Sequence, residues 1–192
     1  MDFDLLNAVS LLETSNGIVA IPGPEGYGLA SRADCTETLE RIQRITGSDS
    51  TMLLLGRDIN AFTPYVETIP KPAFDLMTRH WPGLLIMQLP KASLAPANIC
   101  TGAFVSLIQP EAPILLDLLS LIPGGLLAIS SSGRMGDVSP KTAQAVFDMF
   151  GDDVDYVLQQ DDAVPQSEVA TVVSIDQDGE IHLLRSGRIV LD

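Results

Sequence analysis

The sequence predicts an α/β (α+β) fold, in which helices surround a mixed β-sheet. Helical apolar stripes and short apolar runs typical of buried strands alternate irregularly along the 192 residues, and the chain ends in a strand–turn–strand pattern. A doubly wound Rossmann fold is the weaker alternative, because no GxGxxG follows a predicted strand and no GxxxxGK[ST] loop exists. At this length one core buries most of the apolar surface, so residues 1–192 are predicted to form a single domain.

The N-terminal segment predicts a helix followed by a strand. In residues 3–14, Phe3, Leu6 and Val9 recur at three-residue spacing, as on one face of an amphipathic helix. The apolar run 17–21 then predicts a buried strand that feeds a Pro/Gly-rich tight loop.

The next segment predicts a second helix and strand. Asp34, with Glu37 three residues later, is typical of a capping box at a helix start, and Gly47 ends that helix. A strand is predicted at 52–55. The inward stripe of the helix is Leu39, Ile42 and Ile45.

The middle of the chain predicts two further helices and three further strands. Pro70 and Pro72 open a helix, which the sequence Trp-Pro-Gly at 81–83 stops before the apolar run 84–89. Further strands are predicted at 102–107 and 126–130, with a helix at 114–121 between them.

The C-terminal part predicts one more helix and a hairpin. Ser139 and Pro140 suit the N-cap and the first turn of a helix whose inner face holds Ala143, Val146, Phe147 and Phe150. Strands at 170–175 and 180–184 flank Asp-Gln-Asp-Gly, a hairpin signal with Gly179 at the position of positive φ.

Charge and composition exclude several classes. The formal net charge is −14 and no basic run occurs, so strong RNA binding is disfavoured. Cys35 and Cys100 lack a CxxC or a Cys/His cluster, and His80 and His182 lack an acidic or thiol partner at metal-ligand spacing, so no metal site is predicted. No basic leader and no apolar stretch of about 20 residues is present, which predicts a cytoplasmic protein without membrane contact.

Seven fragments, in their order and spacing, resemble the YrdC-like family of threonylcarbamoyl-AMP synthases, and the likeness spans nearly the whole chain. They are Ile-Pro at 21–22 with Tyr-Gly-Leu at 27–29, the helix start at Asp34, Trp-Pro-Gly at 81–83, Ala-Ile-Ser-Ser-Ser at 128–132, Ser-Pro-Lys-Thr at 139–142, Ala-Thr-Val-Val at 170–173 and Leu-Arg-Ser-Gly at 184–187.

The resemblance implies a twisted mixed sheet with helices around a concave, positively lined cavity. It also implies a reaction that joins ATP, threonine and bicarbonate, with magnesium, into threonylcarbamoyl-AMP for the modification of a tRNA adenosine. Because the triphosphate, bicarbonate and the carboxylate of threonine are negatively charged, such a site needs cations and hydroxyl or backbone donors in one hollow.

Several positions depart from the family pattern. The threonine, glutamate and threonine of its first motif fall on Gly23, Pro24 and Glu25, and its lysine and arginine after the second helix fall on Thr46 and Ser48. A hydroxyl position becomes Ile86, a further arginine position becomes Ile108, and a serine becomes Ala170. Arg185 is the one cation at a matching position.

The resemblance implies two sets of candidate residues. Tyr27 stacks on an adenine or caps the cavity, or it is a core residue. The serine run at 130–132 binds an anion or forms a turn. Glu25 suits a cationic ligand or a metal, or it is a solvated acid. Arg57, Arg134 and Arg188 are possible substitutes for the lost cations. The ligand-binding candidates are Tyr27, Ser130, Ser131, Ser132, Thr171 and Arg185, and the substitute or specificity candidates are Glu25, Arg57 and Arg134.

Two functions follow as hypotheses. The first is a threonylcarbamoyl-AMP synthase relative with weakened or lost activity, which would use ATP and Mg²⁺ if active. The second is a non-catalytic module that binds a small molecule, a nucleotide or a protein. If any anion site remains, Arg185 is predicted to anchor it; the alternative is a surface salt bridge.

Overall fold

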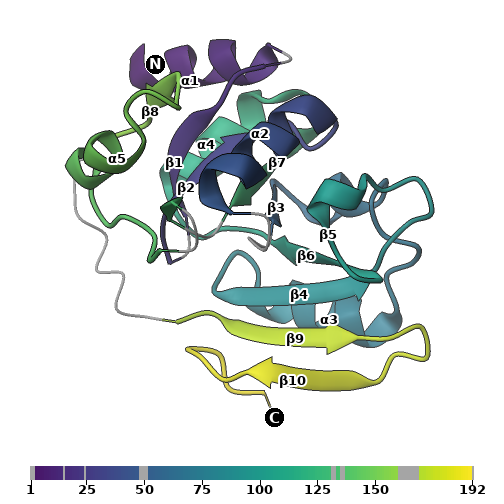
Figure 1. Ribbon diagram of the computed structural model, residues 1–192. Helices are drawn as coiled ribbons and strands as arrows, with labels where there is room; N and C mark the ends of the chain where they lie inside the picture. Colours follow the sequence, from purple (N-terminus) through teal and green to yellow (C-terminus); the bar gives the residue numbers. More distant parts are fainter. Residues whose placement is uncertain are drawn as a thin grey trace.

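The computed structural model describes residues 3–14, 16–23, 25–47, 52–130, 133–134, 137–159 and 169–191. Within these residues a ten-stranded mixed sheet carries five α-helices, which confirms the predicted fold class (Figure 1). The helices are α1 (Phe3–Glu13), α2 (Thr36–Thr46), α3 (Lys71–His80), α4 (Pro113–Leu121) and α5 (Ala143–Phe150), with short 3-10 helices at Ile59–Phe62, Ala97–Ile99 and Pro123–Gly125. The strands are β1 (Val19–Gly23), β2 (Gly26–Ser31), β3 (Met52–Gly56), β4 (Leu85–Pro90), β5 (Cys100–Thr101), β6 (Phe104–Ile108), β7 (Leu126–Ser130), β8 (Tyr156–Val157), β9 (Thr171–Ile175) and β10 (Ile181–Arg185).

The strands follow the order β10-β9-β4-β6-β3-β7-β2-β1-β8, and β5 pairs with β6 beside this path. Parallel pairing joins β1 to β8, β3 to β6 and β4 to β9, and the other neighbouring strands are antiparallel. The predicted C-terminal hairpin is present as β9 and β10, and its turn places Gly179 at φ 83°. It forms the edge of the sheet farthest from α1 (Figure 1).

The core has two layers, one on each face of the sheet. Successive strand residues point to opposite faces, so a central strand supplies both layers. In β3, Leu54 packs in the layer that holds α2, α3 and α5, whereas Leu53 and Leu55 pack in the layer that holds α1 and α4.

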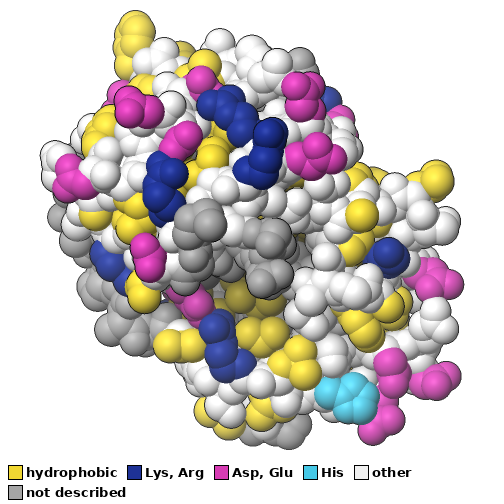
Figure 2. All heavy atoms as spheres, in the orientation of Figure 1, with side chains coloured by type: hydrophobic (Ala, Val, Ile, Leu, Met, Phe, Trp, Pro, Cys, Tyr) yellow, Lys and Arg dark blue, Asp and Glu magenta, His cyan; other side chains and the backbone are white. Residues whose placement is uncertain are grey.

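Helices α1 and α4 cover only part of their face. The cluster that they share with the sheet draws on β1, β2, β3, β6 and β7, while on the same face Ile86 and Gln88 of β4 and Val172 of β9 are only half-buried. Hydrophobic side chains also gather around β9 and β10 in the lower part of Figure 2. The uncovered stretch of sheet is where a pocket can form.

One predicted helix face is wrong. In α1 the buried residues are Leu5, Ala8 and Leu12, whereas Phe3 is 81% exposed. Residues 5, 8 and 12 also follow the helical period, so when most of a helix is apolar its spacing alone cannot show which stripe meets the sheet.

Two predicted caps are wrong. Cys35, not Asp34, is the N-cap of α2, and Asp34 instead accepts hydrogen bonds from Nε and Nη2 of Arg32 at 2.8 and 2.6 Å. This contact holds the pKa of the Asp34 carboxyl below its usual value. Thr142, not Ser139, caps α5, because its hydroxyl accepts from the backbone N–H of Ala145 at 3.1 Å.

Strand β2 has no counterpart in the sequence prediction. It forms a hairpin with β1, and Gly28 lets it approach β7, because a Cβ at that position would lie 2.1 Å from the carbonyl oxygen of Ser130. Glycine is thus required for a close approach inside a strand. Within the described part of the chain, no helix is long and apolar enough to cross a membrane.

Candidate functional site

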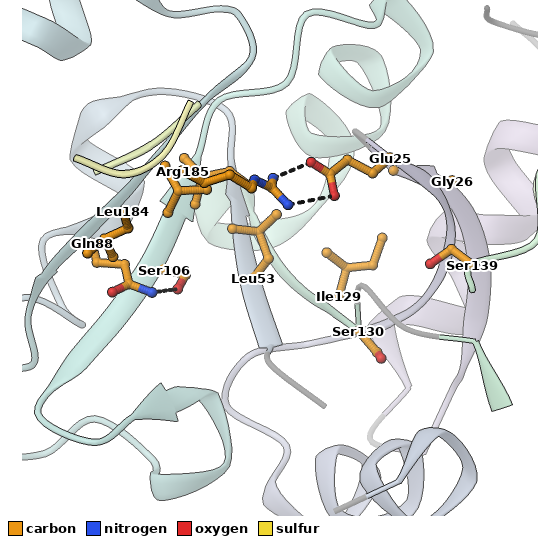
Figure 3. A pocket seen from close by; sticks show the side chains of 13 residues that line it. Glu25, Gly26, Leu53, Gln88, Ser106, Ile129, Ser130, Ser139, Leu184 and Arg185 are labelled. Atoms are coloured by element: carbon orange, nitrogen blue, oxygen red, sulfur yellow. Dashed lines mark hydrogen bonds and ion pairs between the residues drawn. The ribbon is translucent and has the colours of Figure 1, made fainter. Parts of the chain in front are cut away.

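A pocket of about 340 Å³ lies over the uncovered stretch of the sheet (Figure 3). It collects residues from β3, β4, β6, β7, β9 and β10, together with the turn between β1 and β2. Its described lining consists of Gly23 and Gly26, the apolar side chains of Leu53, Ile86, Ile129, Val172 and Leu184, the uncharged polar side chains of Gln88, Ser106, Ser130 and Ser139, and the charged side chains of Glu25 and Arg185.

Arg185 and Glu25 form an ion pair in this lining, and Figure 3 shows the two groups facing each other. Nη2 of Arg185 donates to Oε1 of Glu25 and Nη1 donates to Oε2 at 3.3 Å, so the contact is bidentate. Nε of Arg185 donates to the carbonyl oxygen of Ala170 at 3.1 Å, and the N–H of Ala170 donates to Oε1 of Glu25 at 3.1 Å. The guanidinium charge is therefore matched within the protein.

The turn that carries Glu25 is fixed from the opposite side. Nζ of Lys141 donates to the backbone carbonyl of Glu25, and the N–H of Tyr27 donates to the carbonyl of Pro140 at 2.8 Å. Gly26 has φ 139°, and a Cβ there would lie 2.7 Å from Cβ of Ser139. Only glycine fits this backbone and this contact, so Gly26 fixes the turn from which the side chain of Glu25 reaches the pocket.

Three of the candidate residues meet at this pocket. Ser130, Arg185 and Glu25 all line it, although they lie far apart in the sequence. Ser130 is fully buried at the end of β7. Ser131 and Ser132 lie outside the described residues, as do Pro24 and Ser48.

Tyr27 and Thr171 lie beside the pocket, outside its described lining. Tyr27 is buried within the hydrophobic layer that holds α2. Thr171 is also buried, and its hydroxyl donates to the carbonyl of Ile189 at 2.7 Å and accepts from the N–H groups of Gly187 and Ile189 at 3.1 and 3.0 Å. Thr171 thus fastens the segment that follows Arg185.

The three possible substitute arginines lie outside the described pocket lining, and Arg188 pairs with Glu111 at 3.0 Å. Arg57 pairs with Asp58 at 3.1 Å. Arg134 pairs with Asp153, donates to the carbonyl of Met149 at 2.9 Å and lies over the ring of Phe150. Neither belongs to the described pocket lining.

The positions that depart from the family pattern differ in their surroundings. Ile86 lines the pocket and supplies an alkyl surface. Ile108 is buried in the layer of α1 and α4, and Thr46 is buried at the end of α2, where its hydroxyl donates to the carbonyl of Ile42 at 2.9 Å.

Sequence reasoning missed Gln88, Ser106 and Ser139. Gln88 and Ser106 are cross-strand neighbours, and Nε2 of Gln88 donates to Oγ of Ser106 at 3.2 Å (Figure 3). A signal was present, because each is a polar residue in an otherwise apolar strand. Period-two alternation would have placed both on one face of the sheet.

The prediction that His182 has no acidic partner is wrong. The β9–β10 hairpin brings Asp176, Glu180 and His182 together, with Nε2 of His182 3.6 Å from Oδ2 of Asp176. The backbone N–H of Glu180 donates to Asp176, and this bond chiefly lowers the pKa of the Asp176 carboxyl. All three residues are on the surface, and the turn geometry already accounts for the Asp176 contacts.

A magnesium-bound triphosphate does not fit the described lining. The lining offers one guanidinium, already paired with Glu25, and one carboxylate, already paired with Arg185. Binding of such a group would require unpaired cations and a carboxylate or phosphate oxygen available to the metal. The described residues supply hydroxyls and an amide instead.

A profile of the Sua5, YciO and YrdC proteins, described as "Telomere recombination", matches residues 12–187. Threonylcarbamoyl-AMP synthase of Bacillus subtilis is 31% identical over 150 residues, which are 76% of this chain and 42% of that protein. Threonylcarbamoyl-AMP synthase of Pyrococcus abyssi is 27% identical over 179 residues, which are 91% of this chain and 52% of that protein. This chain thus spans about half the length of these two relatives.

Solved structures agree with this match. A doubly substituted Sua5 of Pyrococcus abyssi superposes with a TM-score of 0.83 at 25% identity, covering 96% of this chain and 56% of that one. YciO of E. coli superposes with a TM-score of 0.79 at 21% identity, covering 95% and 88%, and this second likeness concerns the fold alone. The profile match over most of the chain identifies it: this protein belongs to the Sua5/YciO/YrdC family.

Proposed function

We propose that this protein binds a small molecule in the pocket lined by Glu25, Gln88 and Arg185, and that its threonylcarbamoyl-AMP synthase activity is weakened or lost. The observation that carries the proposal is the ion pair between Glu25 and Arg185. It satisfies the one cationic side chain among the described lining residues.

The family reaction brings together a triphosphate, bicarbonate and the carboxylate of threonine, and its site must neutralise these negative charges. Each charge-assisted hydrogen bond contributes roughly 1.5–3 kcal/mol, and about 1.4 kcal/mol is a factor of ten in affinity. A site that has lost three cationic groups and pairs the fourth internally would therefore bind triphosphate several decades more weakly. The formal net charge of −14 adds a further repulsion.

The second candidate is the family reaction itself in a remodelled site. Two observations favour it: Ser130 and Arg185, both matching positions, lie in one pocket, and two relatives are threonylcarbamoyl-AMP synthases. In that reaction the amine of threonine and bicarbonate form an N-carboxylate (a carbamate) and release water. An oxygen of this carbamate then attacks the α-phosphate of ATP, and pyrophosphate leaves.

Pyrophosphate release distinguishes the two candidates. The protein is incubated with ATP, Mg²⁺, threonine and bicarbonate, and the Bacillus subtilis relative serves as the positive control. We expect a rate at least about 100-fold below that of the relative, which corresponds to roughly 2.7 kcal/mol of lost transition-state stabilisation. A threonine-dependent rate within tenfold of the relative would refute the proposal and establish the second candidate.

A further inference from the structure

We propose that Glu25 is an internal carboxylate that fills an oxyanion cradle in the pocket and so makes the pocket select an uncharged ligand. The cradle consists of the guanidinium of Arg185 and the backbone N–H of Ala170. The inference rests on the proposed binding role of the pocket, and it adds which class of ligand the pocket accepts.

The contacts of Glu25 are those expected of a bound carboxylate ligand. Its Oε1 accepts from Nη2 of Arg185 and from the N–H of Ala170, and its Oε2 accepts from Nη1 of Arg185. A forked guanidinium combined with a backbone amide is a geometry suited to a planar oxyanion. Here the oxyanion comes from the β1–β2 turn of the same chain.

The carboxylate is held in place before any ligand arrives. The carbonyl of Glu25 accepts from Lys141, and the next residue, Gly26, packs against Ser139 with a conformation open to glycine. These contacts fix the backbone of Glu25, and the bonds to Arg185 and Ala170 hold its side chain, so an external anion must displace a tethered competitor. A tethered group competes at a high effective concentration.

The remainder of the pocket suits an uncharged ligand. Its walls are the apolar side chains of Leu53 and Ile129, and its described polar groups away from the ion pair include the Gln88 amide and the Ser106 hydroxyl (Figure 3). An anion placed against these walls would lose hydration without gaining a cation. A compact molecule with amide or hydroxyl groups loses much less.

The experiment compares binding of inorganic pyrophosphate by isothermal titration calorimetry to the wild-type chain and to E25Q. Glutamine keeps the length of the side chain and can still accept a hydrogen bond from Arg185, so the fold is expected to persist. The matched control is E111Q, because Glu111 pairs with Arg188 at 3.0 Å outside the described pocket lining. Both substitutions remove one negative charge beside an arginine.

We expect E25Q to bind pyrophosphate at least about tenfold more tightly than the wild-type chain, whereas E111Q changes the affinity less than about twofold. The double variant E25Q/R185Q is expected to lose the gain, which places the anion at Arg185. E25A serves as a second variant, and circular dichroism checks that each protein is folded.

Equal affinities for E25Q and the wild-type chain would overturn the inference, as would an equal gain in E111Q. Unfolding of both Glu25 variants would overturn it too, since Glu25 would then be a structural residue and not a displaceable one. These outcomes are distinct from failure of the proposed function, which is read from pyrophosphate release by the wild-type chain. Synthase activity of the wild-type chain and an unchanged pyrophosphate affinity in E25Q are therefore two separate results.

Discussion

Two arginine–glutamate pairs tie the C-terminal segment to distant parts of the chain, and they differ in where they lie. Arg185 pairs with Glu25 and Arg188 pairs with Glu111, and all four side chains are between 33% and 47% exposed. The first pair lines the pocket and shares the N–H of Ala170, whereas the second lies outside the described lining. Two ion pairs of the same chemistry and similar exposure therefore have different surroundings, and only the first borders the described pocket.

Thr171 bonds to the segment that carries both arginines, so its replacement should have the largest effect on the stability of this part of the chain. Thr171→Val keeps the shape of the side chain but removes a buried hydroxyl that makes three hydrogen bonds to Gly187 and Ile189. Each buried backbone group left without a partner costs roughly 1–3 kcal/mol, but Gly187 and Ile189 are only half-buried and water can replace part of the loss. We therefore expect the free energy of unfolding to fall by about 2–4 kcal/mol.

Urea unfolding followed by circular dichroism measures this change. Thr78→Val is the control, because the exposed hydroxyl of Thr78 donates only along its own helix, to Phe74 at 2.8 Å. We expect the control to change stability by less than about 0.5 kcal/mol. If the two variants unfold alike, Thr171 does not fasten the segment that carries the arginines.

Double-mutant cycles compare the coupling energies of the two ion pairs, and here the expected effects are smaller. Exposed ion pairs contribute about 0–1 kcal/mol, since solvent screens them. We expect a coupling energy of about 1 kcal/mol between Glu25 and Arg185, where the carboxylate has a fixed backbone and a second donor. For Glu111 and Arg188 we expect about 0.3 kcal/mol. Substitution by alanine, singly and together, gives both coupling energies from urea unfolding. A larger coupling energy for Glu111 and Arg188 than for Glu25 and Arg185 would contradict the expectation that the pocket pair is the stronger one.

Much of the fold could be predicted from the sequence, because periodic apolar residues decide it locally. The strand β7 and the helices α3 and α4 lie close to their predicted ranges, and the Gly179 hairpin is present. Strand β2 was missed because Gly26 and Gly28 weaken a strand signal, and they are needed for contacts with residues far along the chain. Such contacts are a property of the tertiary structure and leave no periodic trace.

The candidate site could be predicted only in part. Arg185 and Ser130 were found through their positions in the family pattern, and Glu25 was identified as a carboxylate near an anion site. That Glu25 would face Arg185 could not be predicted, because 160 residues separate them in the sequence and only the sheet brings them together. The sequence predicts that Glu25 suits a cationic ligand or is a solvated acid, and in the structure its carboxylate is paired with the guanidinium of Arg185.

The central claim is that Glu25 binds Arg185 and the Ala170 N–H in solution, and the backbone amide of Ala170 tests it most directly. In ¹H–¹⁵N correlation spectra at neutral pH, we expect the Ala170 amide proton to move clearly upfield in E25Q, because its charged acceptor becomes neutral. E111Q should leave that resonance in place. An Ala170 resonance that is unchanged in E25Q, or that moves as far in E111Q, would contradict the claim that Glu25 fills the oxyanion cradle.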